Sequence, residues 1–260
     1  MVNKMASIYI TGDIHGDPMR FSNERFPEQK EMVGGKDENF LIICGDFGLV
    51  WSQVCESKSE KYLLNWLEQR PFTVLWVDGN HCNFDRLYSS EYPIEEWHGG
   101  LVQKIRPHVI HLLRGECYDI LGKKFFAFGG ASSHDIRDGI LEPDDKDTIK
   151  EWSKSYYKMF RVNHVSWWKE EIASEEEMRH GLDTLAKHNN KVDYIITHCM
   201  PQDVCYMLSG GFFQPDKMTM YFNEIARNVE FEHWFSGHYH CEERVMGKFD
   251  VLYEKIMRIV

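Results

Sequence analysis

Five short segments rich in aspartate, histidine and asparagine could carry out chemistry in this chain. They are residues 12–16 (GDIHG), 45–46 (GD), 79–81 (GNH), 197–198 (TH) and 237–240 (GHYH). Carboxylate, imidazole and amide groups suit zinc, manganese or iron better than metals that prefer thiolates. In an Asp-x-His or His-x-His pair, the alternation of an extended segment puts both ligands on one face. Each segment alone is a weak signal, but together they predict a metal site.

Each of these segments follows an apolar run that is typical of a buried strand. The runs cover residues 7–11, 40–44, 73–77, 192–197 and 231–236. Between them we predict helices that begin at 17–18, span 57–69, open at 83–87 and span 174–188. The apolar residues at helical spacing in the second helix are Tyr62, Leu63, Trp66 and Leu67. Because binding sites in open α/β sheets form at the carboxyl ends of strands, we expect all five segments to meet there.

The order of these elements predicts the fold class. Alternation of strand and helix over about the first 90 residues indicates parallel strands joined by right-handed crossovers. Short apolar runs broken by turn residues at 101–128, and again at 243–246 and 250–253, predict antiparallel strands. We interpret residues 131–172 as an insertion in a single domain spanning residues 1–260. The aromatic residues of the insertion could pack among themselves or form a wall over a substrate pocket.

Composition and charge restrict the class of partner. The chain has 260 residues, of which 43% are hydrophobic and 14% aromatic, and this is enough to build a sizeable core. Its formal net charge of −11 repels polyanions and so argues against generic binding to nucleic acid. A small phosphate ester stays possible, because bound metal ions can invert the local field.

The cysteines and the apolar runs predict a cytoplasmic protein without a membrane partner. Seven cysteines are present, and their odd number and lack of a CxxC pair favour reduced thiols over a disulfide framework. No run reaches the roughly 18 apolar residues of a membrane-spanning helix, and no apolar signal segment follows the first residues. The oligomeric state is left open.

The five segments together resemble the motifs of the calcineurin-like metallophosphoesterase family: GD-x-HG, GD, GNH, an isolated histidine and GH-x-H. The match runs from residue 12 to residue 240. The resemblance implies an α/β fold with four layers, in which a two-sheet β-sandwich flanked by helices carries a dinuclear metal site at the carboxyl ends of its strands. It implies one ion held by Asp13, His15 and His240, a second held by Asn80, His198 and His238, and Asp46 as the bridge. The two ions would be divalent, or Fe³⁺ with a divalent ion, drawn from manganese, iron and zinc.

The resemblance also implies a mechanism. Two cations about 3.5–4 Å apart lower the pKa of a shared water, and the resulting bridging hydroxide attacks phosphorus in line. His81, the histidine of the GNH motif, would donate a proton to the departing oxygen as the general acid. The expected reaction is therefore the hydrolysis of a phosphomonoester or a phosphodiester.

Three positions depart from the phosphoprotein phosphatase branch of the family. That branch extends the second motif to GD-x-VDRG, whereas Leu49 and Val50 here replace its aspartate and its phosphate-binding arginine. In the third motif, Cys82 stands where that branch has a glutamate after the histidine. Phosphoprotein substrates are therefore disfavoured, and other residues must orient His81 or bind phosphate. Nearby polar side chains are the candidates for substrate binding: Arg86, Asp135 and Arg137.

Three functions compete on the sequence alone. The leading one is hydrolysis of a small phosphate ester, with nucleotides among the candidate substrates. The second is a nuclease of the same family, which the acidic composition disfavours. The third is a non-catalytic scaffold that binds metal, which the complete set of ligands and the presence of His81 disfavour.

Overall fold

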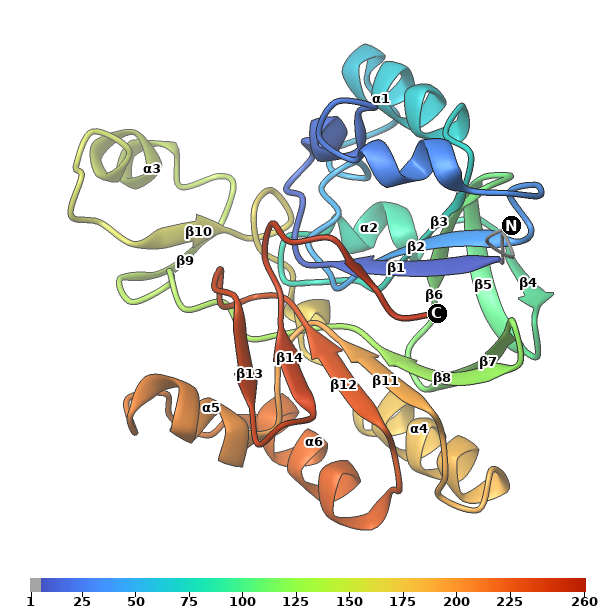
Figure 1. Ribbon diagram of the computed structural model, residues 1–260. Helices are drawn as coiled ribbons and strands as arrows, with labels where there is room; N and C mark the ends of the chain where they lie inside the picture. The colour runs from blue at the N-terminus through green and yellow to red at the C-terminus, as the bar shows by residue number, and fades with distance from the viewer. Residues whose placement is uncertain (1–5) are drawn as a thin grey trace.

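The computed structural model describes residues 6–260, and the apolar runs form two β-sheets that pack face to face (Figure 1). The first sheet has the order β15 (Met257–Arg258), β1 (Ser7–Thr11), β2 (Asn39–Ile43), β3 (Thr73–Trp76), β6 (Val109–Leu112), β5 (Gly100–Arg106) and β4 (Ile94–Trp97). The second has the order β13 (Glu243–Val245), β14 (Phe249–Val251), β12 (His233–Ser236), β11 (Tyr194–Thr197), β8 (Lys123–Phe128) and β7 (Glu116–Ile120). This is the two-sheet sandwich of the predicted α/β class.

Parallel pairing at the centre of each sheet sets the direction of the strands. In the first sheet, β1, β2, β3 and β6 are parallel neighbours, and Ile8 lies opposite Phe40. In the second sheet, β8, β11, β12 and β14 are also parallel, and Ile195 lies opposite Phe126. Within each sheet, the polar residues that follow these strands therefore meet at one edge.

Both faces of the central strands are apolar because both are covered. Along β1, Ile8 and Ile10 belong to the core between the two sheets, whereas Tyr9 belongs to the core under the helices. In the second sheet, Ile196 faces the inter-sheet core and Ile195 faces the opposite helices. The result is four layers in the order helices, sheet, sheet, helices (Figure 1).

The first helical layer contains α1 (Lys58–Glu68), α2 (Phe84–Leu87) and two 3-10 helices, η1 (Pro18–Phe21) and η2 (Pro27–Glu31). A capping box between Ser57 and Glu60 starts α1, and Leu64 and Leu67 bury its apolar face. Tyr62, which we assigned to that face, is instead 68% exposed, so that part of the prediction is wrong. The helix that begins after Asp17 is also only a short 3-10 turn.

The second helical layer contains α4 (Glu175–Lys187), α5 (Gln202–Ser209) and α6 (Lys217–Asn228). The predicted capping box of Ser174 and Glu177 starts α4. α5 and α6 were not predicted, and their buried residues pack with those of α4 against the second sheet. β4 and β15 were not predicted either, and β6 and β7 belong to different sheets although they are neighbours in the sequence.

Residues 131–172, the predicted insertion, contain β9 (Gly139–Leu141), α3 (Lys146–Trp152), β10 (Phe160–Val162) and the 3-10 turn η3 (Lys169–Glu171). We call residues 135–167 the arm, because they project beyond the two sheets (Figure 1). Of the aromatic residues in the predicted insertion, Trp152 packs on Phe160 within the arm, whereas Trp168 is buried against the first helical layer. Tyr156 and Tyr157 are exposed.

Two further predictions concern the whole described chain. All seven cysteines lie within residues 6–260, and each is a free thiol in the structure. Within the same residues, no helix is long and apolar enough to cross a membrane.

Candidate metal centre

The seven predicted metal ligands converge where the carboxyl ends of five strands meet. β1, β2 and β3 from the first sheet lead into Asp13 and His15, Asp46 and Asn80, respectively. β11 and β12 from the second sheet lead into His198, His238 and His240. The backbone N–H of His238 donates to both carboxylate oxygens of Asp13, at 3.0 and 3.2 Å, and thereby joins the two sheets at this point.

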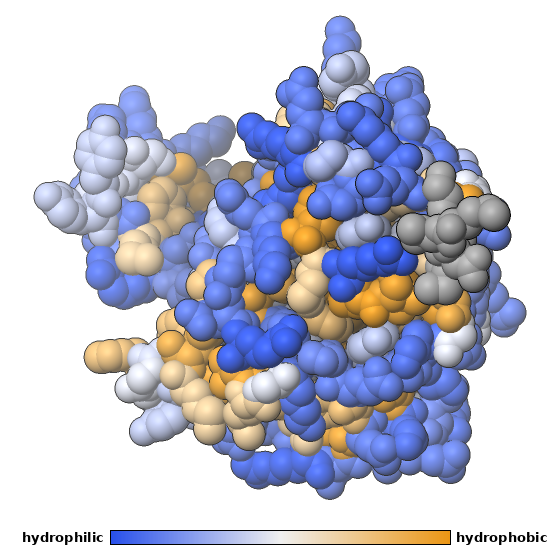
Figure 2. Space-filling view, viewed as in Figure 1, coloured by the Kyte–Doolittle hydropathy of each residue, from blue (hydrophilic) through white to orange (hydrophobic). Residues whose placement is uncertain are grey.

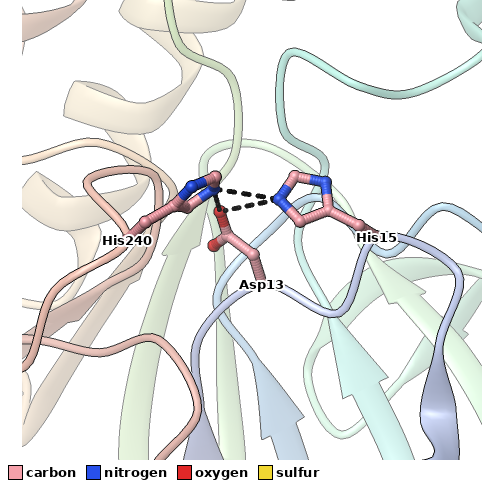
Figure 3. A group of neighbouring side chains, drawn as sticks. All are labelled: Asp13, His15 and His240. Carbon is pink, nitrogen blue, oxygen red and sulfur yellow. Dashed lines mark hydrogen bonds and ion pairs between the residues drawn. The ribbon is translucent and has the colours of Figure 1, made fainter.

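Asp13, His15 and His240 form the first cluster (Figure 3). The Asp13 carboxylate is fully buried, and its Oδ2 lies 3.2 Å from Nε2 of His240 and 3.6 Å from Nε2 of His15. The two histidine Nε2 atoms are 2.9 Å apart, so three ligand atoms converge on one region. His15 and His240 are partly open to solvent, which leaves this side of the site accessible.

Asp46, Asn80 and His198 form the second cluster, deeper in the protein. His198 is fully buried, and its Nδ1 lies 2.8 Å from the backbone carbonyl of Cys44, to which it donates a hydrogen bond. Its Nε2 lies 3.1 Å from Oδ1 of Asn80 and 3.4 Å from Oδ2 of Asp46. In the neutral ring Nε2 carries a lone pair, so three electron-pair donors face one another, and a metal cation fits this arrangement.

The charges in this cluster also favour a cation. Burial acts to lower the pKa of His198, but the carboxylates of Asp46 and Asp13 raise it to about 9. Without a metal ion the ring therefore carries a second proton at neutral pH, and a bound metal ion would replace that proton on Nε2. Burial acts to raise the pKa of Asp46, but His198 and the nearby His81 and His15 hold it well below its usual range. A negatively charged Asp46 therefore lies among several imidazoles, and His15 Nδ1 is 3.9 Å from its Oδ2.

His238 completes the ring of candidate ligands. Its imidazole packs edge-on against that of His198, with centroids 4.9 Å apart, and lies 4.6 Å from the ring of His134. Burial and the neighbouring His198 hold the pKa of His238 well below its usual value. A neutral imidazole retains the lone pair that a metal requires. His134 belongs to none of the five segments and was not among the predicted ligands.

The backbone at the site is unusual at several candidate ligands. Positive φ angles occur at His15 (46°), Asp46 (41°), His238 (69°) and His240 (49°), although only glycine adopts this region freely. Such strain persists where the surrounding structure holds it, and it clusters at functional sites. Sterics also require a glycine at position 45, since a Cβ there would collide with the ring of His198.

His81 lies beside both clusters. Its backbone N–H donates to Oδ1 of Asp46 at 2.8 Å, and its Nε2 lies 4.0 Å from Oδ2 of Asp46. On its other side, Nη2 of Arg161 is 3.4 Å from the same Nε2. A guanidinium can only donate, so the imidazole nitrogen accepts in this arrangement. Burial, together with the positive charge of Arg161, lowers the pKa of His81.

Arg161 and Asp135 form a pair next to His81, and Arg161 was missed by the sequence analysis. Arg161 lies in β10 of the arm and forms an ion pair with Asp135, which was one of the predicted substrate contacts. Arg161 supplies positive charge close to the site, whereas the sequence has Val50 where related phosphatases have an arginine. No motif surrounds Arg161 in the sequence, and only the path of the arm brings it here.

The other two predicted substrate contacts lie elsewhere. Arg86 is buried, and its guanidinium is paired with Glu60, Glu91 and the hydroxyl of Tyr92. We correct its role to packing, because none of its three guanidinium nitrogens is free to bind substrate. Arg137 is 68% exposed and bonds to Asp138 and to the backbone carbonyl of Tyr157 on the arm.

The comparison with protein families agrees with this geometry. A model of the calcineurin-like phosphoesterases matches residues 6–242. The chain belongs to this family. A comparison with curated proteins found no match. Among solved structures, the phosphopantetheinyl hydrolase from Mycobacterium tuberculosis is similar at 15% identity and a TM-score of 0.42, with 97% of this chain and 91% of that chain covered.

Membership in the calcineurin-like phosphoesterase family determines the general activity. The chain is a metal-dependent hydrolase of phosphoesters, and its family typically uses two metal ions. The candidate ligand groups Asp13–His15–His240 and Asp13–Asp46–His198 each bring their ligand atoms within 4.8 Å of one another.

A buried carboxyl group next to the site gives a testable effect of pH on stability. Glu171 is 2% exposed and accepts hydrogen bonds from the N–H and the hydroxyl of Ser133. Burial raises the pKa of Glu171 from 4.5 to about 7. The folded state therefore holds a proton that the unfolded state has lost between these two pH values. Its stabilising contribution is complete below pH 4.5 and is lost as the pH rises to about 7.

We expect the replacement Glu171→Gln to remove this loss. A glutamine mimics the protonated acid, since it can accept from the Ser133 N–H and donate to the hydroxyl. Between pH 4.5 and pH 8, the wild type should lose up to about 3 kcal/mol of unfolding free energy that the variant keeps. Urea denaturation at both pH values measures the difference. The exposed Glu176→Gln serves as the control, and identical pH dependence in wild type and Glu171→Gln would contradict the prediction.

Proposed function

We propose that this phosphoesterase hydrolyses a small phosphomonoester or phosphodiester at a centre of two metal ions. Asp13, His15 and His240 would hold one ion, Asn80, His198 and His238 the other, and Asp46 would bridge them. The observation that carries this proposal is the buried His198. Its Nδ1 is committed to a backbone carbonyl, while its Nε2 faces the oxygens of Asn80 and Asp46. Manganese, iron and zinc suit these ligands.

The bound ions would supply Lewis-acid activation of a water molecule and neutralise charge on the phosphoryl oxygens. The chain itself would supply orientation and a proton. The N–H of His81 holds that residue against Asp46, which keeps the ring beside the metal ligands. When the phosphate of the substrate takes Arg161 as its partner, Nε2 of His81 would become free to carry a proton to the leaving oxygen.

Screening for hydrolysis tests the proposed reaction. The purified protein is stripped of metal and reloaded separately with Mn²⁺, Fe²⁺, Zn²⁺ or Ni²⁺. Each preparation is assayed with p-nitrophenyl phosphate, its bis ester and a panel of nucleotides. We expect hydrolysis that depends on added metal, and the ratio of the two p-nitrophenyl substrates separates a monoesterase from a diesterase. A preparation that binds metal but cleaves none of these esters would overturn the proposal.

Arg161 offers a test of how the phosphate is held. We expect Arg161→Ala to lower kcat/KM by about 10²-fold, because one well-placed charged donor to the transferring group is removed. Arg161→Lys should recover part of the loss, since lysine restores the positive charge but lacks the planar guanidinium that can bind phosphate through two nitrogens.

Arg137→Ala is the matched control for this experiment. It removes an arginine from the same arm, at a position where the side chain is exposed and pairs with Asp138 instead of contacting His81. We expect the control to retain wild-type kinetics, measured on the same ester and with the same metal. Equal losses in both variants would mean that Arg161 acts only on the folding of the arm.

A further inference from the structure

A cavity opens directly beside the metal centre, between the loop that follows β8 and the segment joining α5 to α6. Its volume is about 390 Å³, within the range of about 300–1,000 Å³ typical of small-molecule sites. The residues that matter most in its lining are Ser133, His134, Gln202, Phe212, Phe213 and Tyr239. None of these belongs to the proposed ligand set.

The cavity and the metal centre share a wall. His238, a candidate metal ligand, lines the cavity, and His134 packs against it with ring centroids 4.6 Å apart. Ser133 also lines the cavity, and its hydroxyl accepts a hydrogen bond from Nδ2 of Asn80 at 3.3 Å. The cavity therefore borders the candidate metal site at His238 and Asn80, and the organic group of an ester whose phosphate binds there would lie next to it.

Aromatic rings form one wall of the cavity. Phe213 stacks on Tyr239 with centroids 5.5 Å apart and an angle of 28° between the ring planes. The hydroxyl of Tyr239 accepts from the backbone N–H of Met200 at 3.0 Å and contacts Sγ of Cys205 at 2.9 Å. These bonds fix the orientation of the ring. Apolar residues also reach the surface next to α5 and β13 (Figure 2). Phe212, which lines the cavity, is 84% exposed.

The charge of the cavity restricts what it can accept. Within the described chain, residues 6–260, no lysine or arginine lines it. Its charged residue, Asp216, already accepts from the hydroxyl of Ser132 and from the N–H of Thr219. A second phosphate group would find no cation here. Gln202 also lines the cavity, and its side chain donates to the backbone carbonyl of Phe213.

We propose that this cavity binds the organic group of the substrate and selects phosphate esters whose organic group is flat, aromatic and uncharged. The inference rests on the proposed function, because it places the phosphate of the same ester at the metal centre. Stacking against the fixed Phe213–Tyr239 wall favours an aromatic ring over an alkyl group of similar area. The lack of cationic lining disfavours esters that carry further phosphates.

Three phosphomonoesters test this preference: 2-naphthylmethyl phosphate, its saturated analogue decahydro-2-naphthylmethyl phosphate, and ethyl phosphate. All three release primary alcohols of similar acidity, so differences in kcat/KM reflect binding of the organic group. For the wild type we expect the naphthylmethyl ester to exceed the ethyl ester by about tenfold or more, with the decahydronaphthylmethyl ester between them. Equal values for the naphthylmethyl and decahydronaphthylmethyl esters would overturn the aromatic preference, and equal values for all three would overturn the site.

Variants of Phe213 test whether the preference for aromatic esters arises in the cavity. We expect Phe213→Ala to reduce the ratio of naphthylmethyl to ethyl ester to within about threefold, while kcat/KM for the ethyl ester stays close to wild type. Tyr62→Ala, which removes an exposed aromatic ring from α1 on the other side of the molecule, is the control. Phe213→Leu keeps the bulk of the side chain and serves if Phe213→Ala does not fold. A full preference retained in a folded Phe213 variant would overturn the proposal.

A binding measurement tests the cavity independently of the proposed reaction. Titration calorimetry of the metal-loaded wild type with 2-naphthylmethylphosphonate and with ethylphosphonate needs no hydrolysis. We expect the naphthyl compound to bind about tenfold more tightly. If no ester is cleaved but this binding difference is present, the proposed reaction fails while the cavity is supported. If the esters are cleaved but the two phosphonates bind equally, the cavity proposal alone fails.

Discussion

Asp46→Asn should reduce the rate of phosphoester hydrolysis on the order of 10³-fold or more, together with the metal content of the protein. In the proposed centre, two metal ions would each contribute several kcal/mol of charge stabilisation in the transition state, and Asp46 as the bridge would contribute to both sites. The replacement keeps the shape of the side chain and an oxygen that accepts from the N–H of His81. It removes the negative charge that faces His198. The loss therefore reports on metal binding more than on folding.

Metal content and thermal melting measure this effect independently of the assay. Elemental analysis after dialysis should find close to two metal ions in the wild type and fewer in Asp46→Asn. Added Mn²⁺ should raise the melting temperature of the wild type, because a ligand that binds only the folded state stabilises it, and should raise that of the variant less. Asp183→Asn, at an exposed position on α4, is the control. Full metal occupancy and rate in Asp46→Asn would exclude Asp46 as the bridge.

The convergence of the candidate ligands could be predicted from the sequence because it depends on regular strands. Apolar runs of about five residues are short for helices and favour buried strands, and parallel strands place their carboxyl ends at one edge. Asp13, Asp46 and Asn80 follow three such neighbours in the first sheet. The pairing of β11 with β12 then brings His198 close to His238. Spacing along the chain therefore indicated which residues would meet.

Contacts that depend on irregular chain paths could not be predicted in this way. Arg161 reaches His81 only because the arm folds back from β9 to β10, and no periodic pattern encodes that path. Arg86 was chosen because it is close to His81 in the sequence. In the structure α2 instead directs it toward Glu60 and Glu91, where a buried cation requires paired carboxylates. Proximity along the chain therefore did not predict contacts with His81 at positions where no strand or helix periodicity indicated the direction of the side chain.

The same limit applies to the cavity beside the metal centre. Its aromatic wall combines Phe213, from the segment between α5 and α6, with Tyr239, from the GHYH segment. The sequence showed Tyr239 only as a spacer between two histidines. Its hydroxyl, buried against Met200 and Cys205, gives it a packing role as well. A side chain between two ligands can thus shape the neighbouring pocket, and this could be seen only after the fold was known.

His81→Ala should lower kcat by about 10²–10⁴-fold on esters of alkyl alcohols, because the leaving alkoxide then departs without a proton. On p-nitrophenyl phosphate the loss should be much smaller, since p-nitrophenolate is a stable anion that needs no protonation. Metal content should stay at the wild-type level. The hydrogen bond between His81 and Asp46 comes from the backbone N–H of His81, so it does not depend on the imidazole ring. The side chain can therefore be removed without removing a ligand.

The dependence on the leaving group separates acid catalysis from a positioning role. If His81 only oriented the substrate, the variant would lose the same factor on alkyl and p-nitrophenyl esters. A comparison of variants at His81 and Arg161 distinguishes the roles of these two residues. Arg161→Ala removes a donor to Nε2 of His81 and a charge near the phosphate, so it should weaken hydrolysis of both ester types alike. A leaving-group dependence seen in His81→Ala but not in Arg161→Ala would assign the proton to His81 and the phosphate to Arg161.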